Sequence, residues 1–260
     1  MKLNKLYIVL LAFLYLLSGC SNEKEEYNCF IAGVPDAYDY PIKPGTPEWE
    51  KLTTSYEMDS VLQIPKDVLN SISTEGLIET VLNYPKFGDL YFLDNYQFSF
   101  DRLKEHFNGF QELLTRRDAG IKLFSRYKLM NPACNKNNWP SITGPGSSVS
   151  FSFAFIEIII AQYDILNQFN NEQIKPLLKE TIIKYQEKTR YNYSVFSKKH
   201  TVLIAGRIMY IKNYSPFMEE YKKNIYVKTF IDKVMLYNNF ETLDLIIDYA
   251  NDFYEKYNKR

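Results

Sequence analysis

The chain has 260 residues, with 31 Lys and Arg residues against 31 Asp and Glu residues. This balance, without any basic run, argues against a nucleic-acid partner, because binding to phosphates usually needs a basic domain or face. Hydrophobic residues make up 46% of the chain and aromatic residues 16%, which excludes general disorder. With 22 Tyr and 18 Phe but only 10 Gly and 11 Pro, the composition favours long helices over a many-turned β-sandwich.

Residues 1–19 have the layout of a secretory signal peptide. Lys2 and Lys5 form a short positive region, and every residue from Leu6 to Leu17 is apolar. This apolar run is too short for a membrane-spanning helix, which needs about 20 residues. The alternatives are an uncleaved anchor and an ordinary signal peptide with a chance cysteine behind it. Because the segment carries two lysines and no acid, its removal leaves a slightly acidic mature chain.

The segment ends in Leu17-Ser18-Gly19-Cys20, which resembles the lipobox of bacterial lipoproteins. The resemblance implies that Cys20 becomes the first residue and is acylated, which anchors the protein to a membrane. Lys24-Glu25-Glu26 resembles a surface-export signal of Bacteroidota lipoproteins, and a solvated acidic tether would look the same. We therefore expect a lipid-anchored protein of the outer membrane, on its periplasmic or its surface side, with residues 20–45 as acylated tether and linker.

Two further cysteines, Cys29 and Cys134, lie in irregular segments. Outside the cytoplasm such a pair can form a disulfide bond, which would staple the arm around residue 29 to the folded body. The alternative is two free thiols. Neither cysteine has a histidine close by in the sequence, which argues against a catalytic thiol.

From Thr46 onward the apolar residues recur with a helical period. Thr46-Pro47-Glu48 predicts a helix start, with Trp49, Leu52 and Tyr56 on its buried face. Further helices are predicted over 66–71, 73–84, 98–114, 118–129, 151–169, 171–188, 197–212, two short pieces in 215–236, and 240–257. No strand pattern stands out. We expect an all-α fold, an irregular array of antiparallel helix hairpins resembling an α-solenoid.

Residues 131–150 interrupt this pattern with three prolines, two glycines and no apolar period. We take this long loop as the boundary between an N-terminal helical half, 46–130, and a C-terminal helical half, 151–260. The segment 151–169 is apolar on nearly every face, which predicts a central helix covered on all sides.

The sequence contains few of the residues and motifs that are typical of catalytic sites. His106 and His200 are the two histidines of the chain, and no His, Cys or carboxylate pattern has the spacing of a metal site. Nucleophile-elbow and phosphate-loop motifs are absent as well. The sequence therefore predicts neither a metal nor a cofactor, a partly exposed structural role for His106, and a solvated His200.

Glu157 stands out because it interrupts an apolar helix, where an unpaired carboxylate is costly to bury. Asp164 follows seven positions later, on the same face of a continuous helix. Arg207, in another apolar segment, is the candidate partner of Glu157. We favour a buried ion pair that fixes helix register over an acid/base or metal site.

Three stretches between residues 40 and 130 are similar to a group of uncharacterised Bacteroidota lipoproteins known as hypothetical proteins. The stretches are YPIKPGTPEWEKL, LQIPKDVLNSISTEGLIETVLNYP and FNGFQELLTRRDAGIKLFSRYKLM. The similarity covers the first half strongly and the rest loosely. It implies an envelope location and a helical body, and it transfers no catalytic residue.

These observations favour a non-enzymatic, lipid-anchored module that binds or scaffolds a protein or a glycan. The alternative is a carboxylate-dependent hydrolase acting on glycan or peptide at the envelope, with Glu157 and Asp164 in a cleft between the two halves. Burial of these carboxylates would favour the first hypothesis, and an open pocket lined by them would favour the second.

Overall fold

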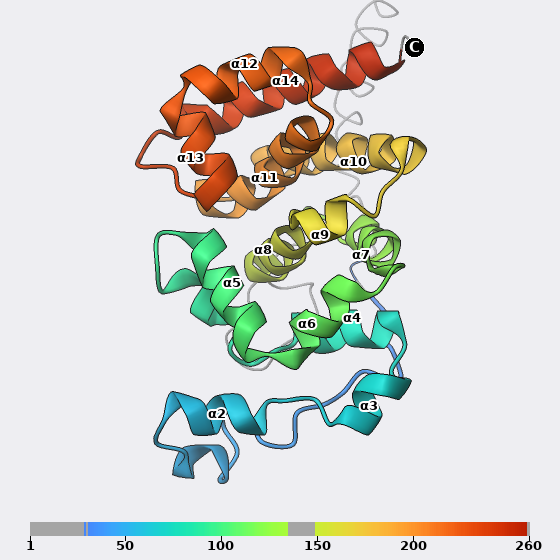
Figure 1. Cartoon of the computed structure of the whole chain (residues 1–260), viewed down its shortest axis with the longest axis vertical. Coiled ribbons are helices and arrows are strands. Elements are labelled where there is room, and N and C mark those ends of the chain that lie inside the picture. The colour runs from blue at the N-terminus through green and yellow to red at the C-terminus, as the bar shows by residue number, and fades with distance from the viewer. Residues whose placement is uncertain (1–28, 30, 135–148, 259–260) are drawn as a thin grey trace, which may run out of the picture.

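The computed structural model describes residues 29, 31–134 and 149–258, and within these residues the protein is all-α, as predicted. Figure 1 shows α10 to α14 at one end, α2 and α3 at the other, and α4 to α9 between them. The helices are η1 (Trp49–Lys51), α2 (Ser55–Val61), α3 (Lys66–Ser71), α4 (Thr74–Leu82), η2 (Phe87–Tyr91), α5 (Tyr96–His106), α6 (Asn108–Thr115), α7 (Ala119–Lys128), α8 (Val149–Ile160), α9 (Tyr163–Leu166), α10 (Asn171–Arg190), α11 (Val195–Ile211), α12 (Ser215–Lys223), α13 (Ile225–Lys233) and α14 (Glu241–Asn258).

The predicted helix start at Thr46 is wrong. Thr46 closes a turn with Lys43, and a single 3-10 turn follows before the chain extends again at Leu52. The first α-helix begins instead behind Thr54, whose hydroxyl accepts from the backbone N–H of Glu57 while the Glu57 carboxylate accepts from the Thr54 N–H. This reciprocal capping box satisfies backbone donors that an open helix end would leave unpaired.

Two predicted helices are each broken in two. The helix predicted over 98–114 divides at Phe107, whose backbone is extended and whose buried ring stacks on Tyr84 with 4.0 Å between ring centroids. The helix predicted over 151–169 divides at Gln162, which is also extended. In both cases apolar residues lie on either side of the break, so that periodicity alone gives no sign of it.

Helix α11 lies at the centre of the C-terminal half, in contact with α8, α10 and α14. Helix α8 is buried along its last two turns, as predicted for a central helix. It also contacts α4 and α7, so one hydrophobic core runs through both halves of the chain. The two halves are therefore packed together rather than separated.

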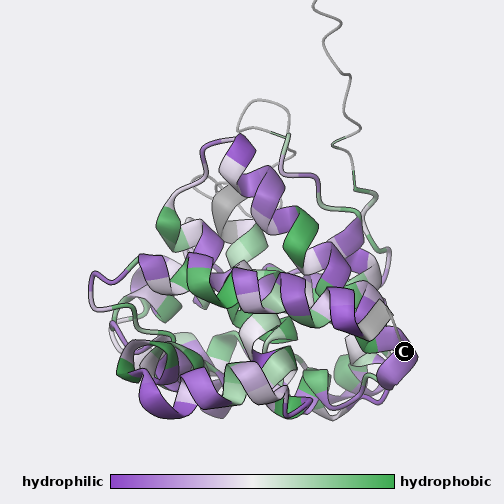
Figure 2. Cartoon of the chain, turned by 90° about the horizontal axis from the view of Figure 1, so that it is seen from above, coloured by the Kyte–Doolittle hydropathy of each residue, from purple (hydrophilic) through white to green (hydrophobic). Residues whose placement is uncertain are grey.

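Helix α14 covers one side of this core and shows the expected amphipathic pattern. Leu243, Ile246 and Ala250 are buried, whereas Asp244 and Asp248 are exposed. In Figure 2, which looks at the molecule from the α12 and α14 end, hydrophilic residues dominate the outward surface of these helices. A single apolar stripe thus places the last helix on the body.

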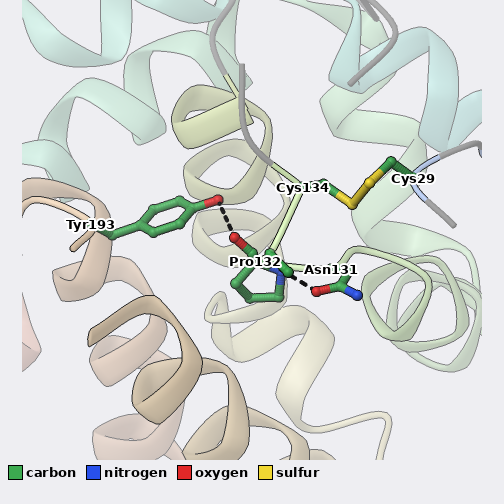
Figure 3. The surroundings of a disulfide bond; sticks show 6 residues. Cys29, Asn131, Pro132, Cys134 and Tyr193 are labelled. Atoms are coloured by element: carbon green, nitrogen blue, oxygen red, sulfur yellow. Dashed lines mark hydrogen bonds between the residues drawn. A yellow bond between two sulfur atoms is a disulfide. The ribbon is translucent and has the colours of Figure 1, made fainter. Parts of the chain in front are cut away.

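The arm that precedes η1 is bound to the body at several points. A disulfide bond joins Cys29 to Cys134, with 5.7 Å between their Cα atoms (Figure 3). Further along, Asp36 accepts hydrogen bonds from the backbone and hydroxyl of Ser73. Tyr40 is buried and donates its hydroxyl hydrogen to a backbone carbonyl of α4. Cys29 and Cys134 are therefore joined in a disulfide bond and are not two free thiols.

The predicted signal peptide, residues 1–19, and Cys20 lie outside the described residues. Within the described part of the chain, no helix combines the length and the apolar character needed to cross a bilayer.

Candidate functional site

An open groove of about 740 Å³ separates α2 from α5, with η2 along one side. Residues from these three elements and from the segments beside them form its walls. The polar lining residues are Ser55, Asp59, Ser60, Gln63, Lys86, Asp89, Ser99, Arg102, Glu105 and His106, and the apolar or aromatic ones are Tyr56, Tyr84, Phe92, Leu93 and Leu103. We call this the α2–α5 groove.

Paired amide hydrogen bonds join the segment after α2 to the break between α5 and α6. Gln63, just after α2, donates to the carbonyl of His106 at 2.8 Å and accepts from the N–H of Asn108 at 3.1 Å. The Asn108 side chain in turn bonds both backbone groups of Ile64. The break between α5 and α6 is thus tied to the end of α2, which fixes the two walls relative to each other.

A cluster of three charged groups lies in the groove. The Lys86 ammonium is 2.5 Å from an oxygen of Asp59, 3.6 Å from an oxygen of Asp89 and 3.0 Å from the Ser55 hydroxyl. The Lys86 and Asp59 side chains are only 15% and 18% exposed. Two carboxylates therefore share one ammonium, and we refer to these groups as the Asp59–Lys86–Asp89 cluster.

The pKa of Asp89 is raised, chiefly because burial disfavours its charged form, although Lys86 acts in the opposite direction. His106 extends the cluster, since its Nδ1 lies 4.0 Å from the second oxygen of Asp59. Half of the His106 side chain is exposed, in agreement with the prediction of a partly exposed residue.

Three large hydrophobic side chains rim the groove. Tyr56 is 81% exposed, Phe92 78% and Leu93 45%. Tyr56 was expected in the core, but the later start of α2 turns it outward. Exposed apolar groups gathered at the edge of an open groove are a common feature of binding sites.

Two charged residues on the α5 side of the groove remain available to a ligand. Arg102 and Glu105 are exposed on α5, and among the described residues neither forms an ion pair. The groove therefore offers guanidinium donors and carboxylate acceptors that are not already used within the protein.

Glu157, the residue singled out by the sequence, does not line the groove. It is fully buried, and its carboxylate accepts two hydrogen bonds of 2.8 Å from Lys188 and one each from Tyr127 and Thr201. A buried ion pair is present, as predicted, but Arg207 is not the partner. Lys188 belongs to the buried face of α10 and follows Lys184, which is also buried, by four residues. Its position on this face is the feature of the sequence that indicates a buried partner for Glu157.

Arg207 is almost completely buried and binds backbone carbonyls instead of a carboxylate. Its guanidinium donates to the carbonyls of Ala161 and Ile231 and to the side chain of Gln97. Ala161 directly follows α8, and Ile231 lies in the last turn of α13. Carbonyls at helix ends lack partners within the helix and carry a partial negative charge, which explains why a cation is stable there.

Asp164 does not share a face with Glu157 because the helix ends before it. Its side chain is 55% exposed and lies 3.4 Å from Lys104. The two carboxylates thus do not converge on an open pocket, and they form no acid/base pair.

His200 is also not where it was expected. Instead of being solvated it is fully buried and stacked on Tyr96, and burial lowers its pKa far below the usual value. Its neighbour Lys199 is 4% exposed and lies over the Tyr96 ring, 3.4 Å from the centroid. Burial lowers the pKa of Lys199 to about 7.

Within the described ranges, no group of three His, Cys, Asp or Glu side chains is placed so that it could hold a metal ion. Comparisons with protein-family models, with curated proteins and with solved structures gave no match to this chain.

Proposed function

We propose that this protein is a lipid-anchored binding module of the bacterial cell envelope and that the α2–α5 groove holds its partner. One observation carries the proposal. The groove combines a fixed charged cluster, free hydrogen-bonding groups on α5 and an exposed hydrophobic rim, which are the components of a recognition site. The partner belongs to one of two classes, protein or glycan.

The location rests on the lipobox around Cys20 and on the similarity to uncharacterised Bacteroidota lipoproteins. The docked arm supports an anchored arrangement. Cys29 follows Cys20 by nine positions, and an extended chain spans at most about 3.5 Å per residue, so Cys29 lies within about 30 Å of the acylated residue.

The alternative of a carboxylate-dependent hydrolase has lost the residues on which it depended. Glu157 accepts four buried hydrogen bonds from three donor groups, and Asp164 is paired with Lys104 outside the groove. The carboxylate pair named for the hydrolase hypothesis is therefore removed.

A retention experiment on envelope material tests the proposal. Full-length acylated protein is immobilised and exposed to solubilised envelope fractions, and bound material is quantified. We expect the double variant Tyr56→Ala and Phe92→Ala to lose retention, because its rim is removed. The matched control, Phe196→Ala and Tyr237→Ala, removes two aromatics outside the groove that are each 61% exposed, and it should retain the partner.

Equal thermal unfolding of both variants shows that the fold is intact. Absence of retention by the wild type, or equal retention by the rim variant, would refute the groove as the binding site. Replacement of Cys20 by Ala should move the protein from the membrane to the soluble fraction, and continued membrane association would refute the anchor.

A further inference from the structure

We infer that the ligand of the α2–α5 groove is a short, uncharged saccharide, with Tyr56 and Phe92 packing against its sugar rings and the polar side chains binding its hydroxyl groups. This inference rests on the proposed function and adds the chemical class of the ligand. It is carried by the charge balance, the hydrogen-bonding capacity and the rim of the groove.

The charge balance disfavours an ionic ligand. Charges of both signs line the groove and nearly balance: the Lys86 ammonium lies between the Asp59 and Asp89 carboxylates, and Arg102 and Glu105 contribute opposite charges to the α5 wall. An anion would meet Asp59 and Asp89, and a cation would meet the Lys86 ammonium. A ligand without net charge avoids both penalties.

The hydrogen-bonding capacity suits hydroxyl groups. A hydroxyl both donates and accepts, and it is best held where acceptors and donors alternate. Asp59 uses one oxygen for Lys86, while its second oxygen lies 4.0 Å from His106. Arg102 supplies guanidinium N–H donors on the facing wall. Neighbouring hydroxyls of a sugar ring can use such groups together.

The aromatic rim suits the apolar face of a sugar ring. Pyranose rings present C–H groups on their faces, and flat aromatic side chains bury such apolar surface at a low cost in conformational entropy. Tyr56 and Phe92 are the two most exposed large hydrophobic side chains of the described part, and both lie at this groove. The volume of about 740 Å³ lies within the range of small-ligand sites and holds a short oligosaccharide.

The common modes of peptide recognition fit less well. Addition of a strand needs a sheet edge, and the described residues form no strand. Docking of an amphipathic helix would place the apolar face of that helix against the charges of the Asp59–Lys86–Asp89 cluster. A proline-rich peptide on the two aromatics is the nearest competitor.

Chemical treatment of the envelope separates the classes. Envelope fractions are treated with periodate, which cleaves vicinal diols, or with a broad-specificity protease, and retention by the full-length acylated protein is compared. We expect periodate to abolish groove-dependent retention and the protease to leave it. Eluted neutral oligosaccharides should rebind, and raising the salt concentration should leave this binding nearly unchanged, because uncharged partners are not screened.

Two groove variants sharpen the test. Tyr56→Ala with Phe92→Ala, and separately Asp59→Asn with Asp89→Asn, should each weaken oligosaccharide binding by about tenfold or more, the equivalent of one or two lost contacts. The control Phe196→Ala with Tyr237→Ala should bind like the wild type. Retention that depends on the groove but resists periodate, or that is lost with protease, would overturn the saccharide inference and leave the binding proposal standing. Loss of groove dependence would overturn both.

Discussion

Glu157 and Lys188 show what a charge inside the core requires. The carboxylate accepts four hydrogen bonds from three donor groups, and the ammonium also bonds the Thr201 hydroxyl and lies over the ring of Phe153. Such a pair stabilises the fold only as long as both charges are present, because either one alone would be buried without compensation.

Replacement of Glu157 by Gln should therefore lower the free energy of unfolding by about 3–5 kcal/mol, since the Lys188 ammonium loses its counter-charge. Chemical denaturation measures the change. The double variant Glu157→Gln with Lys188→Met removes both charges and should recover much of the loss. A single variant as stable as the wild type would show that the pair is not a structural element.

Lys199 permits a prediction about pH. Its pKa is about 7 in the folded protein and 10.5 in a free chain, so between these values the unfolded state holds a proton that the folded state lacks. Lys199 thus makes stability rise with pH across this window, and below pH 7 the full cost of the buried charge is present.

The variant Lys199→Met should consequently be more stable than the wild type at pH 7. The gain is about 1–3 kcal/mol, because contact with the Tyr96 ring offsets part of the burial cost. This gain should shrink steadily as pH rises toward 10. Unfolding free energies measured at intervals across this range provide the check, and a gain that is constant with pH would contradict the assignment.

At the scale of elements, the contact between α11 and α13 depends on a glycine. A Cβ atom at Gly206 would lie 2.3 Å from Cδ1 of Ile231, which is itself fully buried. The absence of a side chain lets the two helices approach closely, at the cost of a poor helix former inside α11.

Gly206→Ala should therefore destabilise the protein by about 1–3 kcal/mol through overpacking. In the Ile231→Val background the clashing methyl is gone, and the same substitution should become neutral or stabilising, because alanine favours the helix. Thermal unfolding of the four proteins in this cycle reports the coupling. Additive effects would mean that the two residues do not compete for space.

Most helices could be predicted from the sequence, but the residues at which they begin and end could not. The amphipathic stripe of α14 and the apolar surroundings of α8 follow directly from periodicity. The breaks at Phe107 and Gln162 depend on tertiary contacts, such as the stacking of Phe107 on Tyr84, which no local pattern encodes. The start of α2 was locally encoded by the Thr54–Glu57 capping box, and the competing signal at Thr46 obscured it.

At the scale of the molecule, the groove could not be predicted from the sequence because its residues come from three segments. Asp59, Lys86 and His106 are distant in the chain, and each has the appearance of an ordinary surface residue. Only the folded arrangement of α2, η2 and α5 around the groove brings them together. The buried ion pair was partly predictable, since the need of Glu157 for a partner followed from its apolar neighbours.

The disulfide should contribute to global stability. Removing a native disulfide from a small exported domain typically costs about 2–5 kcal/mol, and the 105-residue separation between Cys29 and Cys134 places this bond among those that close a long loop. The variant Cys29→Ser with Cys134→Ser should unfold at a lower temperature. Reduction of the wild type should produce the same melting temperature as the variant, and a bond without influence on stability would leave all three equal.

The bond also makes the chain from Cys29 to Cys134 a closed covalent ring, which includes η1 to α7 and every residue of the groove. A protease that cuts one exposed peptide bond inside this ring leaves both fragments linked, so the C-terminal helices stay attached to the N-terminal segment. Nicked protein should therefore run as one species on a gel without reductant and as two with it. In an anchored protein, shedding after such a cut would require a reductant as well as a protease.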